Sequence, residues 1–301
     1  MVSMAWSGED VAGLLNGGVK NARLKELIVT YSSLEEYTET CSGEEGFLGP
    51  RDVHLGGVWA VPYGSELYPR SLAMIRSAPA VLFGRGDPHV LERCVAVVGT
   101  RRASRIGERA AQALAEAARE NGFSVVSGLA AGVDRFGHEA ALACGVPTVG
   151  VLACGADRVY PSEHTDLANR ILEAGGALIS EQLPGTSSSP QRLQMRNRII
   201  TALAWVVMIG EGSSDSKGTL GALRSAIDAG RPVIVPEVRG AWQAHPGAWI
   251  LNELAKDDPD FGMLGLKYDS VHTPIANGVC DSPQMVADAL KVFSVFSNAT
   301  P

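Results

Sequence analysis

The stretch that decides the fold is RCVAVVGTRRASRIGERAAQALAEAARE, residues 93–120, and FSVVSG follows it at 123–128. The apolar run that ends at Gly99 has no polar alternation, which is typical of a parallel strand buried on both faces. The alanine-rich segment after it has helical spacing, and a second apolar run comes next. This order predicts a strand–helix–strand unit with a right-handed crossover.

The same alternation continues toward the carboxyl end of the chain. Further strands are expected at 147–153, 177–181, 205–212 and 232–237, and further helices at 134–145, 164–175, 191–204 and 218–230. We therefore predict an α/β fold with a doubly wound, mostly parallel sheet of the Rossmann-like kind, preceded by a small N-terminal helical region.

Three regions of different character divide the chain. Residues 1–65 are expected to form a short helical region and a linker, because glycine and serine break the helical pieces there. Residues 66–257 carry the alternation of strands and helices and form the predicted Rossmann-like domain. Residues 258–301 are expected to be a tail with a terminal helix around 285–293.

Composition places the chain among ordinary folded proteins. Of its 301 residues, 46% are hydrophobic and 20% are charged, and 26 basic against 33 acidic side chains give a net charge of −7. This balance argues against disorder and against general binding of polyanions. No apolar run approaches the roughly 20 residues of a spanning helix, and the start MVSMAWSGED lacks the features of a signal peptide. We therefore expect a cytoplasmic protein without membrane contact.

The cysteines are odd in number and scattered along the chain. Neither a disulfide framework nor a metal-binding pair can be drawn from them, so we expect reduced thiols, no metal site and no cofactor. The five positions are Cys41, Cys94, Cys144, Cys154 and Cys280.

Gly- or Ser-rich loops follow the predicted strands, at the edge of the sheet where ligands bind in such folds. A helix start in such a loop offers free N–H groups to an anion. The loop GTRRAS at 99–104 does not match a dinucleotide fingerprint, so a nicotinamide cofactor is not expected. The loop GEGSSDSKGT at 210–219 places Lys217 before Gly218, which disfavours a nucleoside triphosphatase.

These loops supply the candidate residues for binding phosphate. The candidates are Gly99, Thr100, Arg101, Arg102, Ser127, Gly128, Arg196, Asn197, Arg198, Lys217, Gly218 and Thr219. Asp134 and His138 lie in the same short segment as Ser127. Catalytic triads are assembled from separate elements, so we expect Asp134 and His138 to be structural residues that line the pocket. Tyr160 and Trp205 are the only aromatic residues expected near the loops, so affinity should be mostly electrostatic.

Five segments together resemble the DNA-processing protein A family (DprA, also called Smf). They are VAVVGTRRASRIG, SGLAAGVDRFGHEAAL, GVLACGADRVYP, LISE and RNRII, and the resemblance covers about residues 66–237. It implies a non-catalytic protein that binds single-stranded DNA and helps to load the recombinase RecA during natural transformation, a recombination process of competent cells. It also implies that residues 99–101, 196–198 and 216–219 contact the DNA backbone.

The sequence departs from the family pattern at one edge. Glu237 follows Pro236 where the family commonly has Pro-Gly, and AHPGAW at 244–249 replaces the stretch expected next. A homodimer, the RecA contact and a change of ligand at this edge therefore stay open.

The alternative function is a small-nucleotide-binding sensor, or an enzyme like the cytokinin-activating phosphoribohydrolases, on the same kind of fold. Ala222 stands where the glutamate of that enzyme family's PGGxGTxxE motif would be. The enzyme would lack its acid/base group, so the sensor is the stronger rival.

Overall fold

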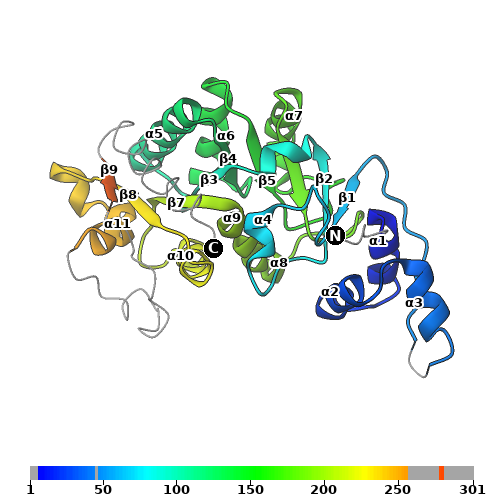
Figure 1. The fold of residues 1–301 in the computed structure, drawn as a ribbon. Helices are drawn as coiled ribbons and strands as arrows, with labels where there is room; N and C mark the ends of the chain where they lie inside the picture. The colour runs from blue at the N-terminus through cyan, green and yellow to red at the C-terminus, as the bar shows by residue number, and fades with distance from the viewer. Residues whose placement is uncertain (1–5, 45–46, 257–277, 281–301) are drawn as a thin grey trace.

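The computed structural model describes residues 6–44, 47–256 and the backbone of 278–280 (Figure 1). A nine-stranded sheet runs through this part of the chain in the order β1-β2-β6-β5-β4-β3-β7-β8-β9. The strands from β3 to β9 pair in parallel, and β1 and β2 add an antiparallel edge. The prediction of a doubly wound, mostly parallel sheet is confirmed.

The strands are β1 (Trp59–Pro62), β2 (Val81–Gly86), β3 (Cys94–Gly99), β4 (Ser124–Ser127), β5 (Thr148–Val151), β6 (Ala177–Ser180), β7 (Ala204–Glu211), β8 (Val233–Pro236) and β9 (Gly278–Cys280). The α-helices of the described residues are α1 (Gly8–Asn16), α2 (Asn21–Thr30), α3 (Leu34–Cys41), α4 (Arg70–Ala73), α5 (Arg105–Asn121), α6 (Val133–Ala143), α7 (Thr165–Glu173), α8 (Pro190–Met195), α9 (Asn197–Leu203), α10 (Lys217–Asp228) and α11 (Trp249–Leu254). Short 3-10 turns are η1 (Pro88–Leu91), η2 (Ser162–His164), η3 (Gly240–Ala244) and η4 (Pro246–Ala248).

Alternate side chains of β3 enter two different hydrophobic cores. Val95 and Val97 pack in the core beneath α5 and α6. Cys94, Ala96 and Val98 pack on the other face, in the core that α9 and α10 cover. Figure 1 shows these two helical layers on opposite sides of the sheet. Because both faces of the strand are buried, an unalternated apolar run is the sequence that this position requires.

The strand order reverses at β3. From β3 the chain builds β4, β5 and β6 on one side, and then returns to build β7 and β8 on the other. At such a reversal the connecting helices leave in opposite directions, which opens a crevice beyond the carboxyl ends of the central strands.

The N-terminal helices α1, α2 and α3 pack against the antiparallel edge of the sheet. Leu14 and Leu24 share a buried core with Val81 and Phe83 of β2. Residues 59–62, which the sequence assigned to a linker, form β1, so that part of the linker prediction is wrong. Among the described strands, β1 pairs with β2 alone, and local sequence carries little signal for one short edge strand.

Two of the predicted helices, at 191–204 and around 285–293, are not confirmed. The helix expected at 191–204 is two helices, α8 and α9, with a break at Arg196. The terminal helix expected around 285–293 lies outside the described residues, and the division into three regions stays a prediction. Among the helices of the described ranges, none combines the length and apolar character needed to cross a bilayer.

The packing of α6 on β3 depends on Gly137, because a Cβ at this position would overlap Val97 Cγ1. We expect Gly137→Ala to lower the free energy of unfolding by about 1–3 kcal/mol, since an overpacked core must shift side chains and backbone. Gly221→Ala in α10 is the matched control. Its Cβ would lie 3.8 Å from Asn197 Nδ2, so this change should raise stability by about 0.5–1 kcal/mol. Denaturant midpoints measure both changes, and equal midpoints for Gly137→Ala and the wild type would contradict the packing argument.

Candidate functional site

A cleft of about 830 Å³ opens at the carboxyl ends of the central strands, where the reversal at β3 places it. We call it the strand-end cleft. Its walls are the loops after β3, β4, β5 and β7, together with segments 188–200 and 245–247. The predicted site residues that line it are Gly99, Thr100, Arg101, Arg102, Asp134, Arg196, Asn197, Gly218 and Thr219.

The remaining predicted residues lie outside the lining of the cleft. The buried Ser127 hydroxyl donates to the Val97 carbonyl at 2.7 Å and joins β4 to β3. Lys217 is exposed at the first position of α10, and His138 is buried in the core. Gly128 lies beneath the Arg196 guanidinium, and Arg198 faces another side of the molecule.

The start of α5, predicted to bind phosphate, already holds an anion of the protein itself. Glu211, the last residue of β7, is fully buried, and its Oε2 accepts hydrogen bonds from the backbone N–H groups of Ser104 (2.7 Å) and Gly107 (3.1 Å). The Ser104 hydroxyl donates to the same oxygen at 3.1 Å. The expectation that this helix start is free for a ligand is therefore wrong. The signal in the sequence was an acid at the end of an otherwise apolar strand.

Arg196 is a buried cation at the floor of the cleft rather than an exposed one. It occupies the break between α8 and α9, and its Nη1 donates to the Val151 carbonyl at 2.9 Å. Its Nη2 lies 3.6 Å from Asp134 Oδ2, and both side chains are more than nine-tenths buried. A Cβ at position 128 would overlap the guanidinium, so Gly128 is needed for Arg196 to enter.

Burial governs the ionisation of this pair. It raises the pKa of the Asp134 carboxyl, while the Arg196 charge and the backbone N–H of Ala130 oppose the shift. Burial also lowers the pKa of Arg196, and Asp134 opposes that shift. Each partner therefore opposes the effect of burial on the pKa of the other, and the pair joins α6 to the helix break.

Arg198 points away from the strand-end cleft. Its guanidinium forms a two-pronged pair with Glu181, and its Nε donates to the Ser77 carbonyl at 3.1 Å. The expectation that it lies beside Arg196 in the cleft is wrong, because residues two apart on a helical turn face different directions. The position of Arg198 does not support the prediction that it binds DNA, which stays a prediction.

Exposed positive charge reaches the rim of the cleft from the loop after β3. Arg101 and Arg102 are both exposed there. Arg102 lies 3.8 Å from Asp215 in a solvent-exposed pair of little energetic weight. Within the described residues, no hydrogen bond or ion pair engages the Arg101 guanidinium.

The start of α10 forms the opposite wall of the cleft and is uncapped. The Ser216 hydroxyl at the cap position bonds to the Ser213 N–H at 3.0 Å instead of to the helix. Thr219 is only 2% exposed, and its hydroxyl finds no hydrogen-bond partner in the described part of the chain. This wall therefore offers a helix start and an unused buried hydroxyl, which are groups that can bind an anion.

The sequence did not single out two other wall residues. His245 belongs to the divergent edge at 244–249, and its Nδ1 lies 3.8 Å from Glu211 Oε1. Tyr160 comes from the loop after β5 and was noted only as an aromatic residue. Among the described residues, no group of three or more His, Cys, Asp or Glu side chains could hold a metal ion.

His138 lies on α6, on the side that faces the core. The Thr148 hydroxyl donates to the Val125 carbonyl at 2.7 Å, so it accepts from His138 Nδ1, also at 2.7 Å. Nδ1 therefore carries a proton, and the buried Nε2 has no partner in the described ranges. Burial, aided by the charges of Arg196 and His164, lowers the pKa of His138 to about 3.

The model of the family described as DNA recombination-mediator protein A matches residues 59–256, which are more than half of the chain. The chain belongs to this family. The resemblance drawn from the five motifs is thereby confirmed.

Two curated relatives cover a similar part of the chain. DNA processing protein DprA of Bacillus subtilis is 35% identical over 179 residues, which are 59% of this chain and 60% of that protein. Protein Smf of Escherichia coli is 37% identical over 174 residues, which are 58% of this chain and 46% of that protein. The chain thus spans about half the length of these relatives.

Solved structures of the family share the fold. DNA processing protein A of Streptococcus pneumoniae matches with a TM-score of 0.67 and 24% identity over 94% of this chain and 97% of that one. DNA processing protein A of Helicobacter pylori, in a structure that describes its mode of binding single-stranded DNA, matches with a TM-score of 0.57 and 26% identity. That match covers 69% of this chain and 93% of the other.

The buried neutral His138 makes the stability of this family member sensitive to acid. Its pKa is about 3 in the folded protein and near 6.5 in the unfolded chain, so below pH 6.5 only the unfolded state takes up the proton. Stability should therefore fall by up to about 1.4 kcal/mol per pH unit from pH 6.5 downward. We expect His138→Asn, which keeps a donor toward Thr148, to flatten the pH dependence of urea unfolding between pH 6.5 and 4.

The matched control for this experiment is His89→Asn, because His89 is exposed. This variant should keep the wild-type slope. A His138→Asn profile parallel to that of the wild type would show that His138 does not resist protonation in the folded state.

Proposed function

We propose that this protein binds single-stranded DNA in the strand-end cleft and holds it mainly by its phosphates. The proposal rests on two anion-binding groups that face each other across the cleft. At one wall stands the Arg101 guanidinium, which has no hydrogen bond or ion pair within the described residues, and at the other stands the uncapped start of α10 with the Thr219 hydroxyl. A guanidinium fork matches phosphate oxygens, and a helix start stabilises negative charge.

Glu211 supports a strand of DNA over a small nucleotide as the ligand. Proteins of this architecture that bind dinucleotides place the pyrophosphate at the start of the helix that follows the first parallel strand. In this chain the Glu211 carboxylate takes the N–H groups of that helix start. Ala222 lines the cleft without a carboxylate, which disfavours the phosphoribohydrolase reaction. The relative from Helicobacter pylori, a single-stranded DNA binder, agrees with this choice.

We extend the proposal to the biological role that the family resemblance implies. The protein would act in the cytoplasm, without chemistry on the DNA, and would help to load a RecA recombinase on the bound strand. Two carboxylates at the cleft support a non-catalytic role, because Asp134 is paired with Arg196 and one oxygen of Glu211 accepts from three donors.

Removing the two rim arginines should weaken DNA binding. We expect Arg101→Ala with Arg102→Ala to lower the affinity for a thymidine oligomer by about 10- to 100-fold, since hydrogen bonds to charged groups contribute about 1.5–3 kcal/mol each and the pair is partly screened. The slope of log affinity against log salt should become shallower by about 1.4, or about 0.7 for each phosphate that the variant no longer neutralises. Fluorescence anisotropy at several salt concentrations measures both quantities.

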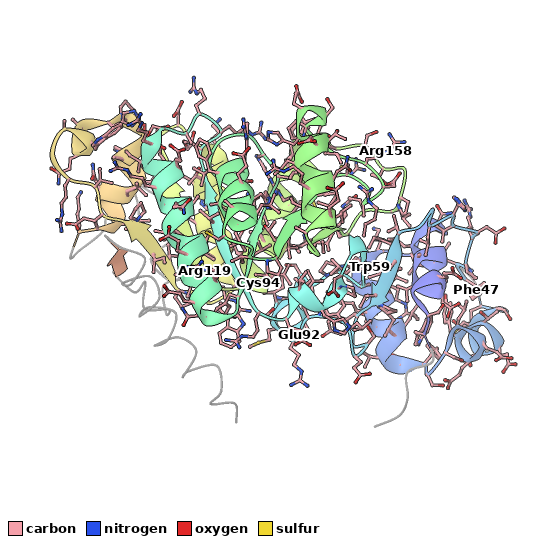
Figure 2. The ribbon with its side chains drawn as sticks, turned by 90° about the horizontal axis from the view of Figure 1, so that it is seen from above. Phe47, Trp59, Glu92, Cys94, Arg119 and Arg158 are labelled. Carbon is pink, nitrogen blue, oxygen red and sulfur yellow. The ribbon has the colours of Figure 1, made fainter. Side chains whose placement is uncertain are left out.

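The matched control removes two arginines from the opposite edge of the sheet. Arg119 and Arg170 lie in the last turns of α5 and α7, which run back toward the amino ends of the strands. In Figure 2, Arg119 is drawn toward the same end of the sheet as Cys94, the first residue of β3, whereas Arg158 in the loop after β5 is drawn toward the other end. Arg119→Ala with Arg170→Ala changes the net charge equally and should leave the affinity nearly unchanged. Equal losses in both variants, or tight salt-independent binding of a mononucleotide, would contradict the proposed site.

The Thr219 hydroxyl gives a test in which stability and binding move in opposite directions. Thr219→Val keeps the shape of the side chain and removes a buried, unpartnered hydroxyl, so the free protein should gain on the order of 1 kcal/mol. The same change removes a donor to the phosphate and should weaken oligomer binding by about tenfold. Urea midpoints and anisotropy titrations measure the two effects. A loss of stability would show that the hydroxyl has a partner in the free protein, and unchanged affinity would show that it does not bind the strand.

A further inference from the structure

The walls of the strand-end cleft include an exposed tyrosine, Tyr160. Tyr160 lines the cleft and is 44% exposed. No hydrogen bond or ring contact engages it within the described ranges, and His245 is the only other aromatic ring among the lining residues there. Its aromatic face is therefore available to a ligand.

The backbone that carries Tyr160 is held in place from both sides. On its N-terminal side, the Gly155 N–H donates to the Thr186 carbonyl at 2.9 Å. On its C-terminal side, η2 begins at Ser162, and His164 Nδ1 lies 2.7 Å from the Leu129 carbonyl. A ring on an anchored loop loses little conformational freedom when a ligand packs on it, which favours binding.

The position of this loop suits a base better than a phosphate. The loop follows β5, which is separated from β3 in the sheet only by β4. At the usual strand spacing, the ends of β5 and β3 are about 10 Å apart. A strand whose phosphates lie on Arg101 and the start of α10 can thus extend its bases toward Tyr160, a wall that carries no exposed cation in the lining of the cleft.

The other aromatic residue considered near the loops is not available for this role. Trp205 lies at the beginning of β7, at the opposite edge of the sheet. Its ring packs on Phe123 at a centroid distance of 5.3 Å, and the Arg93 guanidinium lies 5.5 Å from its centroid. Stacking on Trp205 would require this packed cluster to open.

We propose that Tyr160 stacks against a nucleobase of the bound strand, an inference that rests on the proposed function and names the group that recognises the bases. Bases of a duplex are already stacked on both faces, so a stacking site selects unpaired strands. Because every base has a π-face, the contact should show little sequence preference. Base–aromatic stacking corresponds to a loss of roughly 5- to 100-fold in affinity when the ring is removed.

The test compares two ligands that differ only in their bases. One is a thymidine oligomer, and the other is an abasic oligomer of equal length with the same phosphates. Tyr160→Ala and Tyr160→Leu should bind the thymidine oligomer roughly 5- to 100-fold more weakly, whereas Tyr160→Phe should bind it like the wild type. None of the three should change the affinity for the abasic oligomer. Met74→Ala, a change at an 81% exposed apolar residue outside the cleft lining, is the control and should change neither affinity.

The outcomes separate the stacking proposal from the proposed function. Unchanged thymidine binding by Tyr160→Ala in a wild type that does bind would overturn stacking alone. An equal loss for both oligomers, or a loss in Tyr160→Phe as large as in Tyr160→Ala, would also overturn it, because the ring would not be the binding group. A wild type that binds neither oligomer would overturn both proposals. Equal denaturant midpoints for all variants establish that the comparison concerns binding rather than folding.

Discussion

The Glu211 carboxylate on the N–H groups at the start of α5 is the interaction on which the cleft depends. It joins the end of β7 to the helix that follows β3, across the point where the strand order reverses. It also shapes the divergent edge, because a Cβ at position 247 would overlap this carboxylate. The start of α5 is thus occupied by the protein's own carboxylate, whereas the start of α10 faces the cleft without a side-chain cap. The proposal of an anion at the α10 wall rests on this difference.

Arg196 supports the floor of the same cleft in a different way. Its guanidinium binds the end of β5 and the Asp134 carboxylate at the start of α6, and it lies over Gly128 at the end of β4. One arginine therefore fixes the relative positions of these elements. A buried charge pair of this kind contributes more to a defined geometry than to net stability, because desolvation offsets much of its attraction. The exposed cations at the rim can then bind a ligand without altering the floor.

The cleft combines two kinds of surface. The groups proposed to bind phosphate lie at the ends of β3 and β7, and an aromatic ring lies after β5, so in the proposed complex the two parts of a nucleotide would meet different walls. Such a division would give affinity for the backbone without reading the bases, since phosphate contacts position a strand and base edges specify sequence. The proposed complex would therefore accept unpaired strands of any sequence.

Several features could be predicted because they depend on short stretches of sequence. The apolar run before Gly99 determined a doubly buried strand, the alanine-rich segment after it determined α5, and the repeated order of strands and helices determined a parallel sheet with its ligand edge.

Tertiary structure alone decided the rest, because burial and pairing join residues far apart in the chain. Glu211 and Ser104 are 107 positions apart, and Arg196 reaches Val151 across 45. The β1 strand was missed because its partner β2 lies beyond a loop, and Arg198 was misplaced because helix rotation, rather than sequence spacing, sets the direction of a side chain. The sequence by itself thus determined which residues could bind phosphate, while folding decided which of them the protein neutralises internally and which remain free for a ligand.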